Sequence, residues 1–155
     1  MISFNKQVMC SLLTATIVLL LIPTVEAATE SFTVRAGQEE TRSVNLAVED
    51  RVLIRFTVSG RTTSVLNFYI IDPYGNIMET FENTGSVDYT FVCSQEGTYK
   101  LYFSNIAPVE DKLVILDYEV EHYIFGMPQM LFLTFIVVGT CIAAVTVFIL
   151  MSKHP

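Results

Sequence analysis

The sequence predicts an all-β domain followed by one transmembrane helix: an antiparallel, jelly-roll-like β-sandwich of about seven or eight strands. Apolar residues alternate with polar ones at a period of two residues through most of the chain between Thr29 and Tyr123. No stretch in that region keeps the 3.6-residue apolar period of a helix. Residues 130–151, by contrast, are 22 residues without a charged side chain, which is long enough to cross a hydrocarbon core.

The predicted strands are separated by turn signals. "DPYG", Asp72–Gly75, has the residue preferences of a type I turn, and Gly60, Gly85 and Gly97 mark other corners. Leu113–Leu116 is apolar on both faces, as expected for a central strand or for one covered by a neighbouring segment. The alternating runs are Phe32 and Val34; Val44, Leu46 and Val48; Val52, Ile54, Phe56 and Val58; Leu66, Phe68 and Ile70; Tyr89, Phe91 and Cys93; and Tyr99, Leu101 and Phe103.

The C-terminal apolar run is expected to span a membrane once. Lys153 follows it directly, and a cationic flank marks the cytosolic side, so the N-terminus is expected outside the cytosol. Gly139 and Ala143 form a small-xxx-small pair, a pattern that favours helix association and therefore predicts an oligomer through this helix. Three hydroxyl residues in the span can bond to helix carbonyls: Thr134, Thr140 and Thr146.

The N-terminus has the features of a signal peptide. Lys6 precedes an apolar run from Val8 to Ile22, and small residues at Val25 and Ala27 fit a cleavage site. An uncleaved N-terminal anchor is the alternative. The predicted organisation is therefore a signal peptide at 1–27, an extracytosolic sandwich at 28–123, a juxtamembrane linker at 124–129, a transmembrane helix at 130–151 and a cytosolic tail at 152–155.

The charge of the predicted extracytosolic domain limits its partners. It has 15 acidic and 7 basic residues, a net charge of −8. Nucleic-acid binding requires clustered Lys and Arg, so this class of partner is excluded, and attraction to an anionic lipid surface is equally unsupported.

The domain lacks the residue set of an enzyme. Catalysis by a nucleophile requires a base and a group that orients it, whereas the domain has one His, His122, and one Cys, Cys93. We expect His122 to be a solvated juxtamembrane residue. For Cys93 three interpretations stand: a buried residue of the core, which the alternation favours, half of an intermolecular disulfide, or a reactive thiol.

Loop oxygen atoms are the candidates for a metal site. They belong to Asp72, Asn76, Glu96, Glu110 and Asp111. Calcium requires six to eight converging oxygens, and no EF-hand spacing is present. We therefore favour a solvated acidic rim over a metal site and expect neither a metal nor a cofactor.

One stretch resembles a known family. "GTYKLYFSN" is similar to the G-x-Y-x-x-C-F-x-N string of the GOLD (Golgi dynamics) domain, and in particular to that of the p-twenty-four family of cargo receptors. "LNFYIIDPYGN" matches the strand and turn found upstream in that family. The resemblance covers Val52–Glu121 well. It is carried by Gly97, Tyr99, Phe103 and Asn105, and then by Lys112, Val114 and Val120.

The chain also departs from the family pattern. Tyr102 stands where the family has the second cysteine of a disulfide, and no cysteine lies between Ala28 and Val92. Glu121–Met127 is too short for the helical coiled coil through which family members oligomerise. The tail around Lys153 lacks the paired aromatics and dilysine signals that vesicle coats bind.

The resemblance implies a non-enzymatic module that binds a protein partner or cargo outside the cytosol. The loops "DPYGN" and "APVED" are the expected contact regions, because binding residues concentrate on loops carried by rigid scaffolds. The expected location is the endomembrane system in a eukaryote and the plasma membrane in a prokaryote. Two alternatives remain: a structural subunit of a membrane complex, and a carbohydrate- or calcium-assisted surface using the candidate exposed aromatics Tyr69, Tyr74 and Tyr102.

Overall fold

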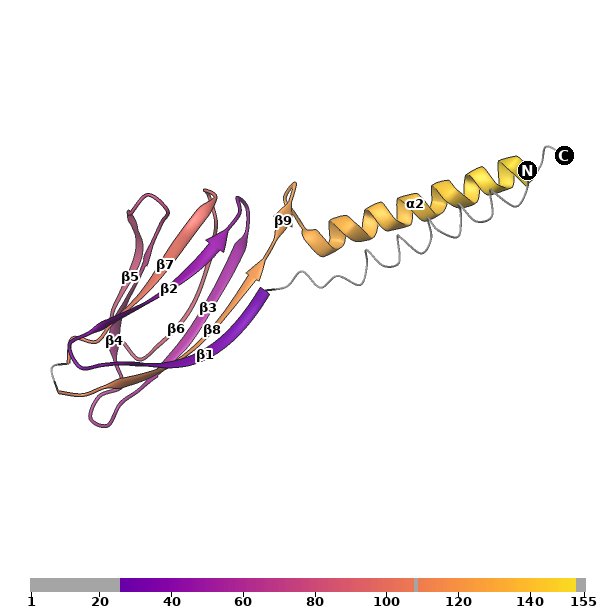
Figure 1. The fold of residues 1–155 in the computed structure, drawn as a ribbon. Coiled ribbons are helices and arrows are strands. Elements are labelled where there is room, and N and C mark those ends of the chain that lie inside the picture. The colour runs from indigo at the N-terminus through magenta and orange to yellow at the C-terminus, as the bar shows by residue number, and fades with distance from the viewer. Residues whose placement is uncertain (1–25, 108, 153–155) are drawn as a thin grey trace. The chain divides into compact units, whose positions relative to one another are not determined.

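The computed structural model describes residues 26–107 and 109–152 and divides into a β-sandwich that ends at Tyr123 and a C-terminal unit that begins at Ile124 (Figure 1). The predicted signal peptide lies outside the described residues, apart from Glu26 and Ala27, which begin the first strand. The cleavage site therefore stays a prediction.

The predicted sandwich is confirmed, and its eight strands follow the jelly-roll order. One sheet has the order β1-β8-β3-β6 and the other β2-β7-β4-β5, with every pairing antiparallel. The chain changes sheet at every connection except β4 to β5. The strands are β1 (Glu26–Val34), β2 (Glu39–Leu46), β3 (Arg51–Ser59), β4 (Leu66–Ile71), β5 (Ile77–Thr84), β6 (Ser86–Val92), β7 (Gly97–Ser104) and β8 (Lys112–Glu121).

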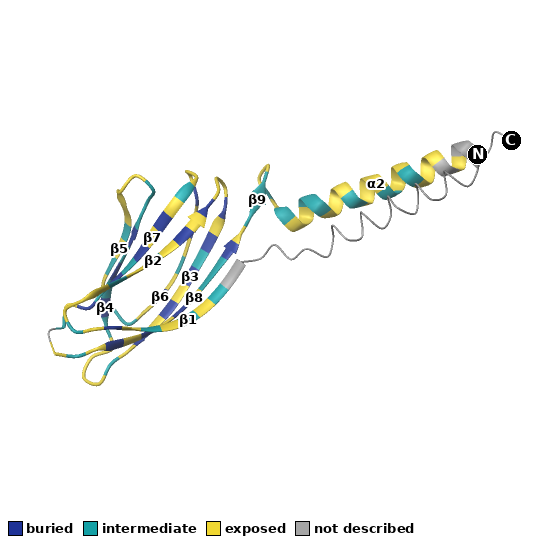
Figure 2. Ribbon diagram, viewed as in Figure 1, coloured by how far each residue is buried: buried dark blue, intermediate teal, exposed yellow. Residues whose placement is uncertain are grey.

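Alternation along the strands builds the core. Successive side chains of a strand point to opposite faces, so buried and exposed residues alternate along β3 and β7 in Figure 2. Phe103 of β7 lies at the centre of the core. Its ring contacts Phe32, Phe56 and Phe68 at centroid distances of 5.1, 5.3 and 4.9 Å, a range in which aromatic pairs add stability beyond the area they bury.

Side chains close the two open sides of the sandwich, where the sheet edges face each other. At the β1–β2 side, the Arg42 guanidinium lies 4.0 Å from the Phe32 ring centroid and pairs with Glu30. At the β5–β6 side, Phe81 and Tyr89 pack edge to face at 5.4 Å. The core is thus covered without a disulfide.

The sandwich has two ends with different loops. We call the loops 35–38, 60–65 and 105–111 the far end, and the loops 47–50, 72–76 and 93–96 the exit end, because β8 finishes there before the chain continues to the helix. The exit end is tied to the last strand by Asp50, whose Oδ1 lies 3.0 Å from His122 Nδ1. His122 is therefore not simply solvated, as the sequence led us to expect.

A short hairpin and a helix follow β8. β9 (Tyr123–Ile124) and β10 (Met127–Pro128) are joined by a two-residue turn at Phe125 and Gly126, both with positive φ, as a tight hairpin requires. α2 (Gln129–Ser152) follows and is long and apolar enough to cross a membrane.

The threonines of the helix are satisfied internally. Thr134, Thr140 and Thr146 donate to the carbonyl oxygens of Met130, Val137 and Ile142 at 2.7–2.8 Å. Their hydroxyls therefore do not oppose insertion into lipid, where an unpaired polar group would be costly.

Candidate functional site

The family-motif residues have structural roles in and around β7. Gly97 has φ 148°, and a Cβ there would lie 2.8 Å from Pro73, so the turn before β7 requires glycine. Tyr99 is buried and its hydroxyl donates to the carbonyl of Gln95 at 3.0 Å. Burial raises the Tyr99 pKa to about 12. Phe103 lies at the centre of the core, and the buried Asn105 is the first residue of the far-end loop 105–111.

Asn105 joins two far-end loops. Its side chain is buried, and Nδ2 donates to the carbonyl oxygens of Val34 (3.1 Å), Arg35 (3.2 Å) and Glu110 (2.7 Å). Its Oδ1 accepts from the N–H of Ala107 at 3.1 Å. Because a buried amide without partners is costly, these contacts fix the course of the loops 35–38 and 105–111.

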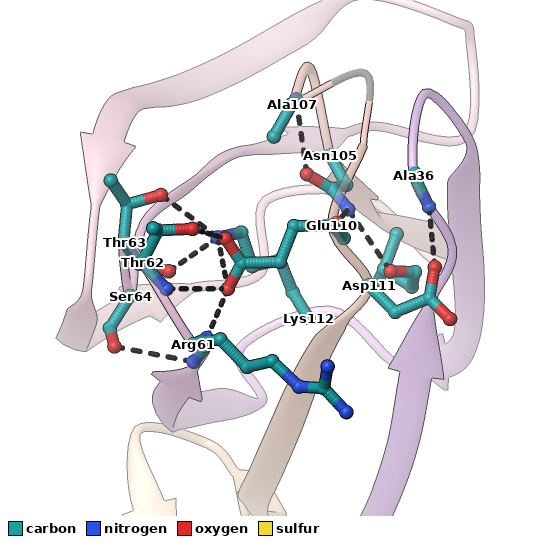
Figure 3. A network of polar contacts seen from close by, with 12 residues as sticks. Ala36, Arg61, Thr62, Thr63, Ser64, Asn105, Ala107, Glu110, Asp111 and Lys112 are labelled. Carbon is teal, nitrogen blue, oxygen red and sulfur yellow. Dashed lines mark hydrogen bonds and ion pairs between the residues drawn. The ribbon is translucent and has the colours of Figure 1, made fainter.

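A buried lysine ties the third loop to the same network. Lys112 is fully buried, and Nζ donates to the Thr63 carbonyl, to Thr63 Oγ1 at 2.8 Å, and lies 3.3 Å from Glu110 Oε1. Figure 3 shows these groups converging from the loops 60–65 and 105–111. A Cβ at Gly60 would collide with the Thr63 carbonyl, Glu110 and Lys112, which explains the glycine at the start of loop 60–65.

The Glu110 carboxylate faces inward to backbone donors. It accepts from the N–H groups of Arg61 and Thr62, the latter at 3.0 Å, and from Thr62 Oγ1. These hydrogen bonds, led by that of the Thr62 hydroxyl, lower the Glu110 pKa to about 2, because they favour the ionised form. The Glu110 carboxylate is therefore ionised throughout the physiological pH range, and its hydrogen bonds hold loop 60–65 in place.

The network leaves an apolar loop tip facing solvent. Ile106 is 61% exposed and Val109 is 90% exposed, while Asn105 and Glu110 on either side are bonded into the domain. Gly37 N–H donates to the Ala107 carbonyl at 3.1 Å, which ties loop 35–38 to the tip. These two exposed aliphatic side chains on a fixed loop form a candidate contact surface, because binding residues concentrate on loops carried by rigid scaffolds.

The second predicted contact loop, "DPYGN" at the exit end, is organised by Asp72. Asp72 Oδ1 accepts from the N–H groups of Tyr74 (2.9 Å) and Asn76 (2.7 Å), and Oδ2 accepts from Asn76 Nδ2 at 2.8 Å. The Asn76 side-chain bond is the main cause of a lowered Asp72 pKa. Aspartate side chains commonly stabilise turns by accepting hydrogen bonds from backbone N–H groups in this way.

The remaining sequence candidates do not converge on a site. Within the described residues, no three His, Cys, Asp or Glu side chains are arranged to hold a metal ion. Tyr69 and Tyr102 are brought together, stacked at 4.9 Å with an interplanar angle of 3°, whereas Tyr74 lies apart in the loop 72–76. Cys93 is buried and its Sγ donates to the Gln95 carbonyl at 3.0 Å, which agrees with the core interpretation.

Tyr102 occupies the position at which the family has a cysteine, and its ring makes a side-chain contact there. It stacks on Tyr69, whose hydroxyl donates to Glu39 Oε2 at 2.6 Å. Burial is the main cause of a Tyr69 pKa of about 12, followed by this bond. Glu39 lies on β2 and Tyr69 on β4, so the contact crosses β7. Side-chain contacts therefore join three strands of the sheet that carries Tyr102.

Sequence patterns alone did not identify the roles of Lys112 and Glu110. One signal was available: alternation along β8 places Lys112 on the same face as Val114 and Leu116, which are buried core residues. A lysine on the core face must find buried partners. Which partners it finds depends on loops distant in the sequence.

These features define an eight-stranded jelly-roll domain linked to one apolar helix. A family model described as emp24/gp25L/p24 family/GOLD matches residues 30–129. The chain therefore belongs to the emp24/gp25L/p24 GOLD family, as its motif residues indicated, and that family is generally non-enzymatic and membrane-associated in the secretory pathway.

Similar solved structures exist at low sequence identity. A periplasmic inhibitor of g-type lysozyme from Aeromonas hydrophila is 12% identical, with 63% of this chain and 86% of that chain covered and a TM-score of 0.44. The pre-peptidase C-terminal domain of a Bacillus anthracis collagenase is 13% identical, with 57% and 87% covered and a TM-score of 0.46. Neither likeness carries a functional argument. No curated protein matches the chain.

Proposed function

We propose that this protein is a membrane-anchored, non-enzymatic interaction module that binds a protein partner or cargo outside the cytosol through its far end. Family membership and the apolar helix support the class of protein. The observation that carries the binding surface is the apolar tip, Ile106 and Val109, on a loop fixed by Asn105 and Glu110. A loop already held in one conformation loses little entropy on binding.

Photo-crosslinking of the full chain in its native membrane tests this surface. A benzophenone amino acid replaces Ile106 or, in a second variant, Val109. Ile77 is the matched control, because it is 62% exposed but begins β5 next to the exit end. We expect discrete crosslinked protein adducts from positions 106 and 109 and none from position 77. Equal labelling from all three positions, or none from any, would refute the far end as the binding surface.

We further propose the topology inferred from the sequence: a signal peptide over 1–27, the sandwich over 28–123 outside the cytosol, a linker over 124–129, a membrane span over 130–151 and a cytosolic tail over 152–155. Protease added to sealed vesicles of known orientation tests it. The sandwich is expected to be protected in vesicles whose lumen is extracytosolic, and an N-terminal sequence beginning at Ala28 would establish the cleavage site.

We propose that the transmembrane helix associates through Gly139 and Ala143. Small residues let helix backbones approach closely, and the helix has polar side chains that are already bonded internally. Replacing both residues with Leu is expected to abolish energy transfer between labelled chains in membranes. The control replaces Val138 and Ile142, each one residue earlier on the helix, with Leu. Unchanged energy transfer in the variant with Leu at positions 139 and 143 would exclude this face.

A further inference from the structure

Most cations of the sandwich are already engaged within the domain. Arg42 pairs with Glu30 and Glu40, Arg55 with Asp88, and Lys112 with Glu110, while the Arg51 guanidinium lies 4.6 Å from the Tyr123 ring centroid. In the part of the chain that the structure describes, three exposed cations form no ion pair: Lys100 on β7, Arg35 and Arg61. The two arginines belong to far-end loops.

The far-end network explains why these two guanidinium groups are unpaired. The neighbouring carboxylates are used by backbone donors: Glu110 accepts from the N–H groups of Arg61 and Thr62, and Asp111 Oδ1 accepts from Ala36 N–H at 2.9 Å. In Figure 3 the Arg61 side chain extends away from the Glu110 carboxylate that its own backbone binds. The local negative charges thus hold the loops in place instead of neutralising the arginine side chains.

The two arginines belong to two loops that are both bonded to the loop with the apolar tip. The Arg35 carbonyl accepts from Asn105 Nδ2 at 3.2 Å, at the start of loop 105–111. The Arg61 backbone is bound to Glu110, near the end of the same loop. The far end therefore combines two exposed aliphatic side chains with two unpaired cations.

The rest of the sandwich is strongly negative. The far-end loops contain two Arg and two acidic residues and are formally neutral, so the domain's net charge of −8 lies in the remainder. A negatively charged partner is repelled by most of the surface and directed to the far end, since long-range fields steer association.

From these observations we infer that the partner presents an acidic segment, with carboxylates next to an aliphatic side chain, to Arg35, Arg61 and the apolar tip. This inference rests on the proposed function and names the chemistry of the ligand. A compact acidic segment fits better than an anionic membrane. A membrane is an extended negative plane that would also face the charge of −8, whereas a short segment meets only the far end.

The sequence of the crosslinked partner peptides provides the first test. Peptides recovered from positions 106 and 109 of the full chain are expected to be rich in Asp and Glu next to Leu, Ile or Val. Neutral or basic peptides would overturn the inference while leaving the proposed function intact. The absence of any adduct would instead count against the proposed function itself, so the two failures are distinguishable.

Charge reversal provides the second test. Arg35→Glu together with Arg61→Glu is expected to lower the crosslink yield by about tenfold, and high salt is expected to lower the wild-type yield, since exposed charges are screened. Lys100→Glu is the matched control, because it reverses an exposed cation on β7 away from the far-end loops and should leave the yield within about twofold.

Two outcomes of this second test would overturn the inference. One is an equal loss of crosslinking in the Lys100 variant, which would indicate a general charge effect. The other concerns lipid binding. The full chain in neutral-lipid nanodiscs would bind vesicles of phosphatidylcholine and phosphatidylserine, and the charge reversal of Arg35 and Arg61 would abolish this binding. That result would assign these arginines to a lipid surface. Unchanged thermal unfolding of each variant shows that the fold is retained.

Discussion

The two ends of the sandwich are both held by buried polar side chains, but to different extents. At the far end, Asn105, Lys112 and Glu110 join three loops in one network. At the exit end the contacts fall into two separate groups: those of Asp50 with Ala47, Cys93 and His122, and those of the Asp72 turn. A network fails as a unit, whereas separate ties fail one at a time. We therefore expect larger effects from far-end substitutions.

The largest expected effect is that of Lys112→Met. The side chain keeps its approximate length, but the Thr63 carbonyl loses the buried ammonium donor and Glu110 loses its cation. Breaking a buried ion pair by removing one partner costs about 3–5 kcal/mol in the free energy of unfolding. Urea unfolding of the full chain in detergent, followed by circular dichroism, measures it.

A double-mutant cycle with Glu110→Gln is the control for Lys112→Met. If the two residues act in one network, the double variant should lose less stability than the sum of the single variants. Additive losses would contradict the description of the far end as a single unit.

Asn105→Ala is expected to have the next largest effect. It leaves the carbonyls of Val34, Arg35 and Glu110 without their amide donor, at a cost of about 2–3 kcal/mol. Asn105→Asp keeps an acceptor for Ala107 N–H but removes the donors and places a charge in a buried site, so it should be at least as damaging. Hydrogen exchange of loop 105–111 should rise in both variants. Protection that remains at the wild-type level would contradict the proposed role of Asn105.

At the exit end, Gly97→Ala is expected to destabilise the domain by about 2 kcal/mol, through its positive φ and the contact with Pro73. Gly75→Ala is the matched control, because its φ of 89° is also unfavourable for alanine but nothing lies within 4 Å of the added Cβ. The difference between the two melting temperatures isolates the steric contact. If Gly97→Ala costs more than Lys112→Met, the ranking of the two ends is wrong.

The smallest expected effect is a pH dependence of the stability contributed by Glu110 at the far end. The folded-state pKa of Glu110, about 2, lies below its ordinary value of 4.5, so its stabilising contribution is fully present above about pH 4.5 and is lost as the pH falls toward 2. The stability difference between wild type and Glu110→Gln should therefore shrink over this range. A difference that stays constant from pH 6 to about pH 2 would show that the carboxylate charge does not lock loop 60–65.

Much of the fold could be predicted from residue patterns. Alternation in β3 and β7 identified core residues such as Ile54 and Phe103 because side-chain direction in a strand depends only on position. The charge-free run before Lys153 likewise identified the apolar helix. The hairpin at Phe125 and Gly126 was not anticipated, since the segment was interpreted as a linker, and neither was the pairing of His122 with Asp50.

The sequence by itself determined the class of fold, the core-facing residues, the apolar helix and, through the stretch from Gly97 to Asn105, the family. These features depend on periodicity and local turn geometry, which neighbouring residues set. Only the tertiary structure decided what the polar residues do. Asn105, Glu110 and Lys112 are close in the sequence, but their partners Val34, Thr62 and Thr63 come from distant segments, so these contacts exist only in the folded domain. The same is true of Arg35 and Arg61, which form no ion pair within the described residues because the nearby Glu110 and Asp111 carboxylates accept from backbone N–H groups.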